Sequence, residues 1–313
     1  MSKYIPPHRR SLQGPIQSRN DVCGGGRGNS SRPWNGALQP FSEKVLFVGD
    51  SFIRLFGLVQ HKDIIVKGFK GASAKGIGRD GNGNRDTIRR WVQQAQPQRI
   101  VLCFGSVDVH LSYYHTKYAK EGGPTIDLAG VATGYVEFAA SLRSLYPRTQ
   151  ENLPSIHIVG IYPSPLKEEH VQGSLEKYGA IPREGIILDP VDISRAGRQD
   201  RAIAYNRSLE AACRTHGLCF ENAFWEVLDP TTNLLKPSFQ DVAEQNIHIV
   251  WETTILLWLD RWEWLRAYVK PGFMERLQTT LDEYLLTKSW ADATHIASKV
   301  GVEQAFDRSR IAN

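Results

Sequence analysis

The sequence predicts an α/β fold with three layers, in which a parallel sheet has helices on both faces. Short apolar runs of strand length recur along the chain, helical patterns separate them, and this alternation continues from Val45 onward. Such an order builds a parallel sheet because each crossover helix packs against one face of the sheet. At 313 residues, the chain is long enough for one large domain of this kind with extensions.

Each expected element has its own pattern. The predicted strands are Val45–Val48, Asp63–Val66, Arg99–Phe104, Ile156–Ile161 and Leu218–Glu221. The predicted helices of the domain are Arg85–Ala95, Leu128–Leu145, Arg198–His216 and Trp251–Tyr268. Two further helices are expected at Met274–Lys288 and Trp290–Val300. We therefore divide the chain into an arm (1–42), an α/β domain (43–270) and a C-terminal helical extension (271–313).

Residues 1–42 are rich in Gly, Pro, Ser, Asn and Arg and have no hydrophobic periodicity, which predicts disorder. The first 35 residues contain six Lys or Arg and a single acid, Asp21. A basic arm is compatible with RNA or an acidic protein partner, and also with an ordinary solvated tail. The segment Tyr4-Ile5-Pro6-Pro7-His8 resembles the N-terminal arm of one group of DEAD-box RNA helicases. That resemblance implies an RNA or protein partner for residues 1–42.

The chain contains no uncharged apolar stretch long enough to span a bilayer, and a polar, proline-rich segment opens it. We therefore expect a cytoplasmic protein that does not enter a membrane. The four cysteines lack the paired spacing of a zinc site. No metal site and no cofactor are predicted.

The turn Gly49-Asp50-Ser51 directly follows the first predicted strand. Open α/β sheets place their ligands and their chemistry at the carboxyl ends of the strands. Ser51 is therefore a candidate nucleophile. Taken alone, the pattern favours a turn residue or the N-cap of the following helix.

Several segments in order resemble the conserved blocks of the SGNH (GDSL-like) hydrolase superfamily between Lys44 and Tyr268. These segments are Val48-Gly49-Asp50-Ser51, Phe69-Lys70-Gly71-Ala72-Ser73-Ala74-Lys75-Gly76, Phe104-Gly105-Ser106-Val107-Asp108-Val109-His110 and Asn246-Ile247-His248, with 198–220 resembling the family's penultimate helix and strand. The resemblance implies an SGNH- or flavodoxin-like α/β/α fold. It also implies that Ser51 is the nucleophile and His248 its base, with the backbone N–H groups of Ser51 and Gly71 as oxyanion donors.

Two positions depart from this pattern. Gln245 stands where the family has an aspartate three residues before the histidine, and Val107 stands at the family's asparagine. In serine proteases, asparagine in place of the triad aspartate costs about 10⁴ in turnover. Loss of one oxyanion donor costs roughly 10²–10³. Asp241 or Glu244 is the candidate for the carboxylate that orients His248.

Four polar residues are candidates for lining the site. They are Asp50, Ser106, Asp108 and His110. For Asp108 and His110, ordinary polarity at the end of a strand is an equally good interpretation. The following segment, 111–118, contains three tyrosines and a lysine. These rings could stack on a sugar or a base, or they could pack the segment onto the domain.

The resemblance implies a serine esterase or deacetylase that acts on a small ester or an acetylated carbohydrate. Acyl transfer to a carbohydrate would use the same residues. The departures at Gln245 and Val107 imply a weakened triad and oxyanion hole. The alternative is a catalytically inactive SGNH-like binding or assembly protein, associated with RNA or a ribonucleoprotein.

Overall fold

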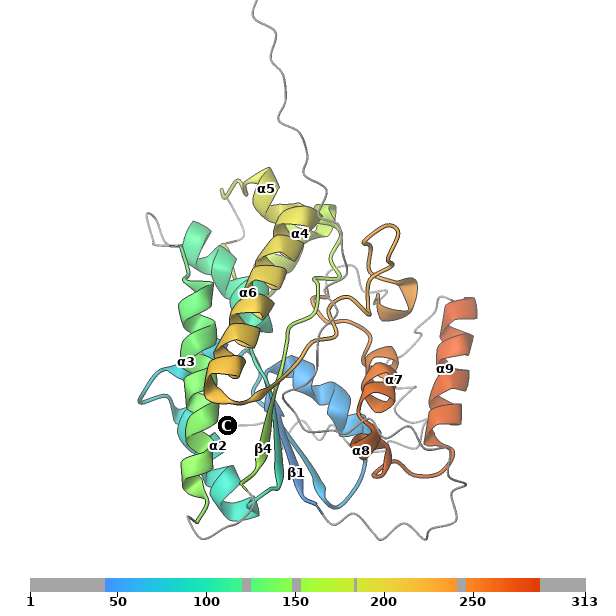
Figure 1. Ribbon diagram of the computed structural model, residues 1–313. Helices are drawn as coiled ribbons and strands as arrows, with labels where there is room; N and C mark the ends of the chain where they lie inside the picture. The colour runs from blue at the N-terminus through green and yellow to red at the C-terminus, as the bar shows by residue number, and fades with distance from the viewer. Residues whose placement is uncertain (1–42, 120–124, 148–152, 183–184, 241–245, 288–313) are drawn as a thin grey trace, which may run out of the picture. The chain divides into compact units, whose positions relative to one another are not determined.

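Five parallel strands form one sheet in the order β2-β1-β3-β4-β5 (Figure 1). The computed structural model describes residues 43–119, 125–147, 153–182, 185–240 and 246–287. The predicted arm and the predicted helix 290–300 lie outside these residues. The strands are β1 (Val45–Gly49), β2 (Ile64–Gly68), β3 (Arg99–Cys103), β4 (Ser155–Val159) and β5 (Cys219–Glu221). Each overlaps a predicted strand, and the predicted α/β class is confirmed.

Helices follow the strands in the predicted order. The α-helices are α1 (Ala74–Gly78), α2 (Gly83–Ala95), α3 (Leu128–Ser141), α4 (Glu168–Lys177), α5 (Pro190–Ile193), α6 (Arg195–His216), α7 (Trp251–Arg261), α8 (Glu263–Arg266) and α9 (Phe273–Thr287). The short 3₁₀-helices are η1 (Ser51–Leu58), η4 (Leu142–Leu145) and η5 (Pro237–Phe239). In the described part of the chain, no helix has the length and apolar character needed to cross a membrane.

The helices cover both faces of the sheet. Helices α2, α3 and α6 lie on one side, and η1, α7 and α8 lie on the other (Figure 1). Strand β1 is buried throughout, and its side chains alternate between two hydrophobic cores. Leu46 and Val48 belong to the core under α3 and α6, whereas Val45 and Phe47 belong to the core under η1 and α7. The sheet is therefore the middle of three layers.

The helix expected over Trp251–Tyr268 is interrupted at Trp262, and this prediction was wrong in its length. Trp262 leaves the helical conformation, with φ −105° and ψ 88°. The rings of Trp262 and Trp264 both lie against Phe47, at centroid distances of 6.5 and 6.3 Å. Residues two apart point to opposite sides of a continuous helix. Because the helix is interrupted at Trp262, the rings of Trp262 and Trp264 can both pack in the core beside Phe47.

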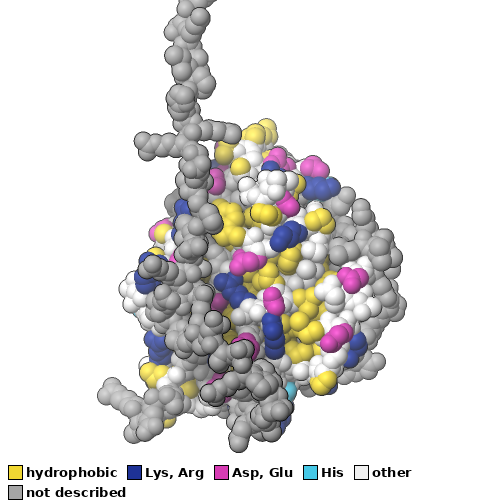
Figure 2. Space-filling model, turned by 45° about the vertical axis from the view of Figure 1, so that its right-hand side comes forward, with side chains coloured by type: hydrophobic (Ala, Val, Ile, Leu, Met, Phe, Trp, Pro, Cys, Tyr) yellow, Lys and Arg dark blue, Asp and Glu magenta, His cyan; other side chains and the backbone are white. Residues whose placement is uncertain are grey.

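Helix α9 packs on the core of the domain. Phe273, Leu277 and Leu281, spaced four residues apart, are buried in the core that also contains Trp258 of α7. Figure 2 shows the face of the molecule on the α9 side. Among the described residues of that face, basic, acidic and apolar side chains are interspersed. Those described residues form no large surface of a single charge on this face.

Gly105 determines how the chain leaves β3. Its φ is +121°, a conformation that glycine adopts far more readily than other residues. A Cβ atom at this position would lie 2.4 Å from Cε1 of the Tyr205 ring. The chain therefore turns closely over Tyr205, and residues 106–110 begin at the carboxyl edge of the sheet.

The close approach at Gly105 gives a test of this turn. We expect Gly105→Ala to destabilise the protein by about 3 kcal/mol, because strain at positive φ adds to overpacking against Tyr205. Gly81→Ala is the matched control, since Gly81 has φ +76° but nothing within 4 Å of the added Cβ. That variant should lose only about 1 kcal/mol. Equal losses in urea unfolding would contradict the packing of Tyr205 under Gly105.

Candidate active site

Ser51 opens η1 at the carboxyl edge of the sheet, one residue after Asp50. The N-cap of η1 is Asp50, whose Oδ1 accepts a hydrogen bond of 2.9 Å from the N–H of Phe52. The capping role that Ser51 could have filled is therefore taken by Asp50. The Ser51 hydroxyl is left to make a different contact.

That contact is with His248. Ser51 Oγ lies 2.6 Å from His248 Nε2, although the two residues are 197 positions apart in the sequence. The imidazole ring lies against the ring of Phe52, with centroids 4.7 Å apart, and meets Trp251 edge-on at 6.2 Å. A serine hydroxyl within hydrogen-bond distance of an imidazole nitrogen is the arrangement that activates a serine nucleophile. The two predicted catalytic residues are thus brought together.

The other ring nitrogen of His248 faces an amide. Asn246 Oδ1 lies 2.9 Å from His248 Nδ1. The predicted orienting carboxylates, Asp241 and Glu244, lie outside the described residues. The sequence reasoning did not select Asn246. The available signal was its spacing, since Asn two residues before another residue commonly bonds that residue's backbone in an Asx-turn.

The expected oxyanion donors are Ser51 and Gly71. In the described part of the chain, neither backbone N–H has a hydrogen-bond acceptor. Gly71 has φ +72°, and the space beside its Cα is open. Val107, at the position of the family's asparagine, supplies no side-chain donor. Ser106 is buried, and its Oγ has no hydrogen-bond partner within the described residues.

Two buried carboxyl groups lie behind this edge. Burial raises the pKa of Asp50 to about 7, against the lowering effect of the Phe52 N–H. Burial also raises the pKa of Asp108 to about 6, although this carboxylate accepts hydrogen bonds from two backbone N–H groups. Its Oδ2 and Oδ1 lie 2.6 Å from Ala74 N and 3.1 Å from Lys75 N. Asp108 therefore ties the turn after β3 to the first turn of α1.

His110 connects the turn after β3 to the segment after β4. Its Nε2 lies 3.2 Å from the carbonyl oxygen of Tyr162. Since a carbonyl can only accept, this nitrogen carries a proton and donates it. Burial lowers the pKa of His110 to about 4, so the ring is neutral at neutral pH. In the described ranges, no three His, Cys, Asp or Glu side chains are grouped as they would be to hold a metal ion.

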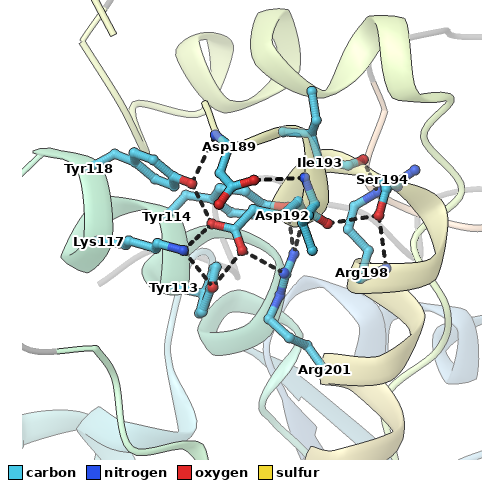
Figure 3. Close-up of polar contacts among 12 residues, drawn as sticks. Tyr113, Tyr114, Lys117, Tyr118, Asp189, Asp192, Ile193, Ser194, Arg198 and Arg201 are labelled. Atoms are coloured by element: carbon cyan, nitrogen blue, oxygen red, sulfur yellow. Dashed lines mark hydrogen bonds and ion pairs between the residues drawn. The ribbon is translucent and has the colours of Figure 1, made fainter. Parts of the chain in front are cut away.

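The tyrosines of segment 111–118 pack this segment onto the domain (Figure 3). The segment forms two π-helical turns, η2 (Asp108–Ser112) and η3 (His115–Ala119). Three side chains converge on the carboxylate of Asp192: the hydroxyls of Tyr113 and Tyr118, and Lys117 Nζ at 2.6 Å. Of the two interpretations of the tyrosines, the structure thus favours packing over stacking on a ligand.

Helix α6 completes this cluster. Arg201 Nη2 donates to the backbone oxygen of Asp192 at 2.8 Å, and the guanidinium lies 4.2 Å from the ring centroid of Tyr113. Burial alone would raise the pKa of Asp192, but the hydrogen bonds from Lys117, Tyr118 and Tyr113 outweigh it and lower the pKa. The segment that follows the site is therefore held to α5 and α6 by a charged, nearly buried contact.

No family model and no curated protein match the chain. Solved structures to which it is similar include an aryl esterase of M. smegmatis, at 13% identity over 72% of this chain and 100% of that one, with a TM-score of 0.43. Another is an acetyl-xylooligosaccharide esterase variant from Geobacillus, at 17% identity over 73% and 96%, with a TM-score of 0.42. A GDSL-like lipase from Bacteroides thetaiotaomicron is similar at 14% identity over 72% and 88%, with a TM-score of 0.42. Since these TM-scores are below 0.5, we derive the chemistry of the site from its own residues.

The buried carboxyl of Asp50 makes stability depend on pH. The folded protein holds this proton up to about pH 7, whereas the ordinary pKa is 3.8, so stability falls as the pH rises between these values. Asp50→Asn keeps an oxygen for the Phe52 N–H and removes the titration. From about pH 4 to pH 8, we expect the free energy of unfolding to fall less in the variant than in the wild type. One pKa unit corresponds to about 1.4 kcal/mol, so the two losses should differ by at most about 4 kcal/mol. Parallel urea-unfolding curves for the two proteins across this range would contradict a protonated Asp50.

The Asp192 cluster can be tested by truncation. Asp192→Ala removes the carboxylate that accepts from Lys117 and two tyrosine hydroxyls and that lies 3.6 Å from Arg201 Nη1, and we expect a loss of about 3 kcal/mol in the free energy of unfolding. Asp189→Ala is the control, because the exposed carboxylate of Asp189 caps α5 through Val191 N at 2.8 Å, while its backbone N–H, which donates to the Tyr118 hydroxyl, stays in the variant. It should cost about 1 kcal/mol or less. A loss at Asp192 no larger than that of the control would show that the cluster does not hold the segment.

Proposed function

We propose that the protein is a serine esterase or deacetylase of the SGNH type, with Ser51 as nucleophile and His248 as general base. The observation that carries this proposal is the contact of 2.6 Å between Ser51 Oγ and His248 Nε2. A non-catalytic platform has no need of a serine hydroxyl bonded to an imidazole at the carboxyl edge of the sheet. The contact therefore favours an enzyme over the assembly alternative.

In the first step, Ser51 Oγ attacks the carbonyl carbon of the ester while its proton passes to His248 Nε2. The carbonyl π electrons move onto the oxygen, and a tetrahedral intermediate forms. When the intermediate collapses, the bond to the leaving alkoxide breaks and His248 returns the proton to it. Water then attacks the acyl-Ser51 ester by the same route, and the carboxylic acid and free Ser51 are released.

The oxyanion of the intermediate is stabilised by the N–H groups of Ser51 and Gly71. Their lack of acceptors in the described part of the chain supports this role. Val107 offers no third donor from a side chain, and the loss of one donor costs roughly 10²–10³ in turnover. We therefore expect slower turnover than a complete donor set would give, unless the buried hydroxyl of Ser106 replaces the missing amide.

The substrate class that we propose is a small ester or an acetyl group, including one on a carbohydrate. The neighbouring polar residues Asp50, Asp108 and His110 remain proposed as the surroundings of the site. Asp108 and His110 already bond backbone groups of α1 and of the segment after β4. We propose that they position the surrounding turns, while Ser51 and His248 carry out the chemistry.

Substitution of the two central residues tests the proposal. We expect Ser51→Ala and His248→Ala each to lower kcat/KM for p-nitrophenyl acetate by about 10³ or more. The double variant should be no slower than either single variant, because the two groups act as one unit. Ser208→Ala, which removes a hydroxyl bonded only to its own helix, is the control and should leave turnover unchanged. Undiminished hydrolysis by Ser51→Ala would rule out the esterase assignment to this site and leave the assembly alternative.

A further inference from the structure

Asn246 lies two residues before His248, and its side chain folds back onto that histidine. Its Oδ1 accepts a hydrogen bond of 3.1 Å from the backbone N–H of His248, which is the geometry of an Asx-turn. The same oxygen lies 2.9 Å from the ring nitrogen Nδ1 of His248 and 3.4 Å from the hydroxyl of Tyr178, at the end of α4. Three polar groups thus converge on one amide oxygen.

The backbone contact identifies this amide atom as oxygen. A backbone N–H can only donate, so the atom it meets must be an acceptor, which excludes the NH₂ end of the amide. Since the oxygen also faces Nδ1, the ring nitrogen there has to carry the proton in a neutral imidazole. The other nitrogen, Nε2, then presents its lone pair to the Ser51 hydroxyl. The turn therefore selects the tautomer that a general base requires.

In serine proteases, an asparagine behind the catalytic histidine leads to the other tautomer. In serine proteases, replacing the aspartate with asparagine lowers turnover about 10⁴-fold because the histidine adopts the wrong tautomer. An amide that turned its NH₂ group toward the ring would favour that tautomer, because NH₂ can only donate. Here the backbone of His248 itself holds the oxygen in place. The short turn thus fixes by geometry which end of the amide faces the ring.

We propose that Asn246 is a positioning residue of this site: its amide oxygen, fixed by an Asx-turn, orients the His248 ring and holds its proton on Nδ1. This inference rests on the proposed function of Ser51 and His248. It adds a residue that the motif-based assignment leaves out, since the family's pattern places an aspartate at position 245. Asn246 touches no reacting atom and acts through His248.

Two variants of Asn246 separate shape from charge. Asn246→Leu keeps a similar size and removes the oxygen, and we expect kcat to fall roughly 10-fold to 100-fold with KM little changed. Asn246→Asp keeps the turn and adds a negative charge beside the ring, which favours the protonated imidazole. We expect the acid-side inflection of its pH–rate profile to move upward by about one unit. Asp50 and Asp108 also titrate near neutral pH, but they are the same in all these proteins, so the difference between profiles reports on His248.

A matched control is Asn222→Leu. Asn222 forms the same kind of turn, with Oδ1 accepting from Phe224 N at 3.0 Å, but it follows β5, three strands away from β1. This variant should change neither kcat nor the pH profile. Full activity of Asn246→Leu, or an unmoved inflection in Asn246→Asp, would overturn the proposal.

The tautomer itself can be observed without any turnover. In protein labelled with ¹⁵N-histidine, long-range ¹H–¹⁵N spectra distinguish a protonated from an unprotonated ring nitrogen, and His248→Gln assigns the signal among the nine histidines. At a pH where the ring is neutral, we expect the proton on Nδ1 in the wild type and a shift toward Nε2–H in Asn246→Leu. An unchanged tautomer in that variant would contradict the role of Asn246. If neither the wild type nor any variant hydrolyses esters, the proposed function fails. The spectra would still decide whether Asn246 positions the ring.

Discussion

Strand β1 pairs with β2 along one edge and with β3 along the other, and its side chains alternate between the two hydrophobic cores. A strand held on two edges and two faces has no freedom to shift its register. The residues directly beyond its end, Asp50 and Ser51, therefore have fixed positions. The chemistry proposed for this protein depends on that constraint, because a misplacement of the nucleophile by about 1 Å can cost roughly 10²-fold in rate.

The other half of the site comes from a part of the chain almost 200 residues away. His248 precedes α7, whose buried residues Ile255 and Trp258 pack in the same core as Phe47 of β1. The two halves thus meet through a shared core. Separate polar contacts hold the surrounding turns: Asp108 ties the turn after β3 to α1, and Asp192 ties the following segment to α5 and α6. The site is therefore preorganised by several polar contacts that hold its loops to helices and strands.

Much of this arrangement can be predicted from the sequence. The exceptions depend on contacts that form only in the folded chain. The strands are predictable because each is a short apolar run, and Ser51 and His248 because ordered motifs mark them. The break at Trp262 depends on two tryptophans that need the same core, which no local pattern reveals. The role of the tyrosines around Lys117 depends on Asp192, more than 70 positions away. No motif marks Asn246, because its proposed role depends on contacts with the backbone and ring of His248.

The central claim is that Ser51 is an activated nucleophile, and the most direct measurement is covalent labelling. A fluorophosphonate reacts with serine hydroxyls whose proton is removed by a base. Intact-mass and peptide mass spectrometry of the full-length protein should find a single adduct on Ser51, with labelling abolished in His248→Ala. Absence of an adduct, or an adduct on another serine that persists in His248→Ala, would contradict the account.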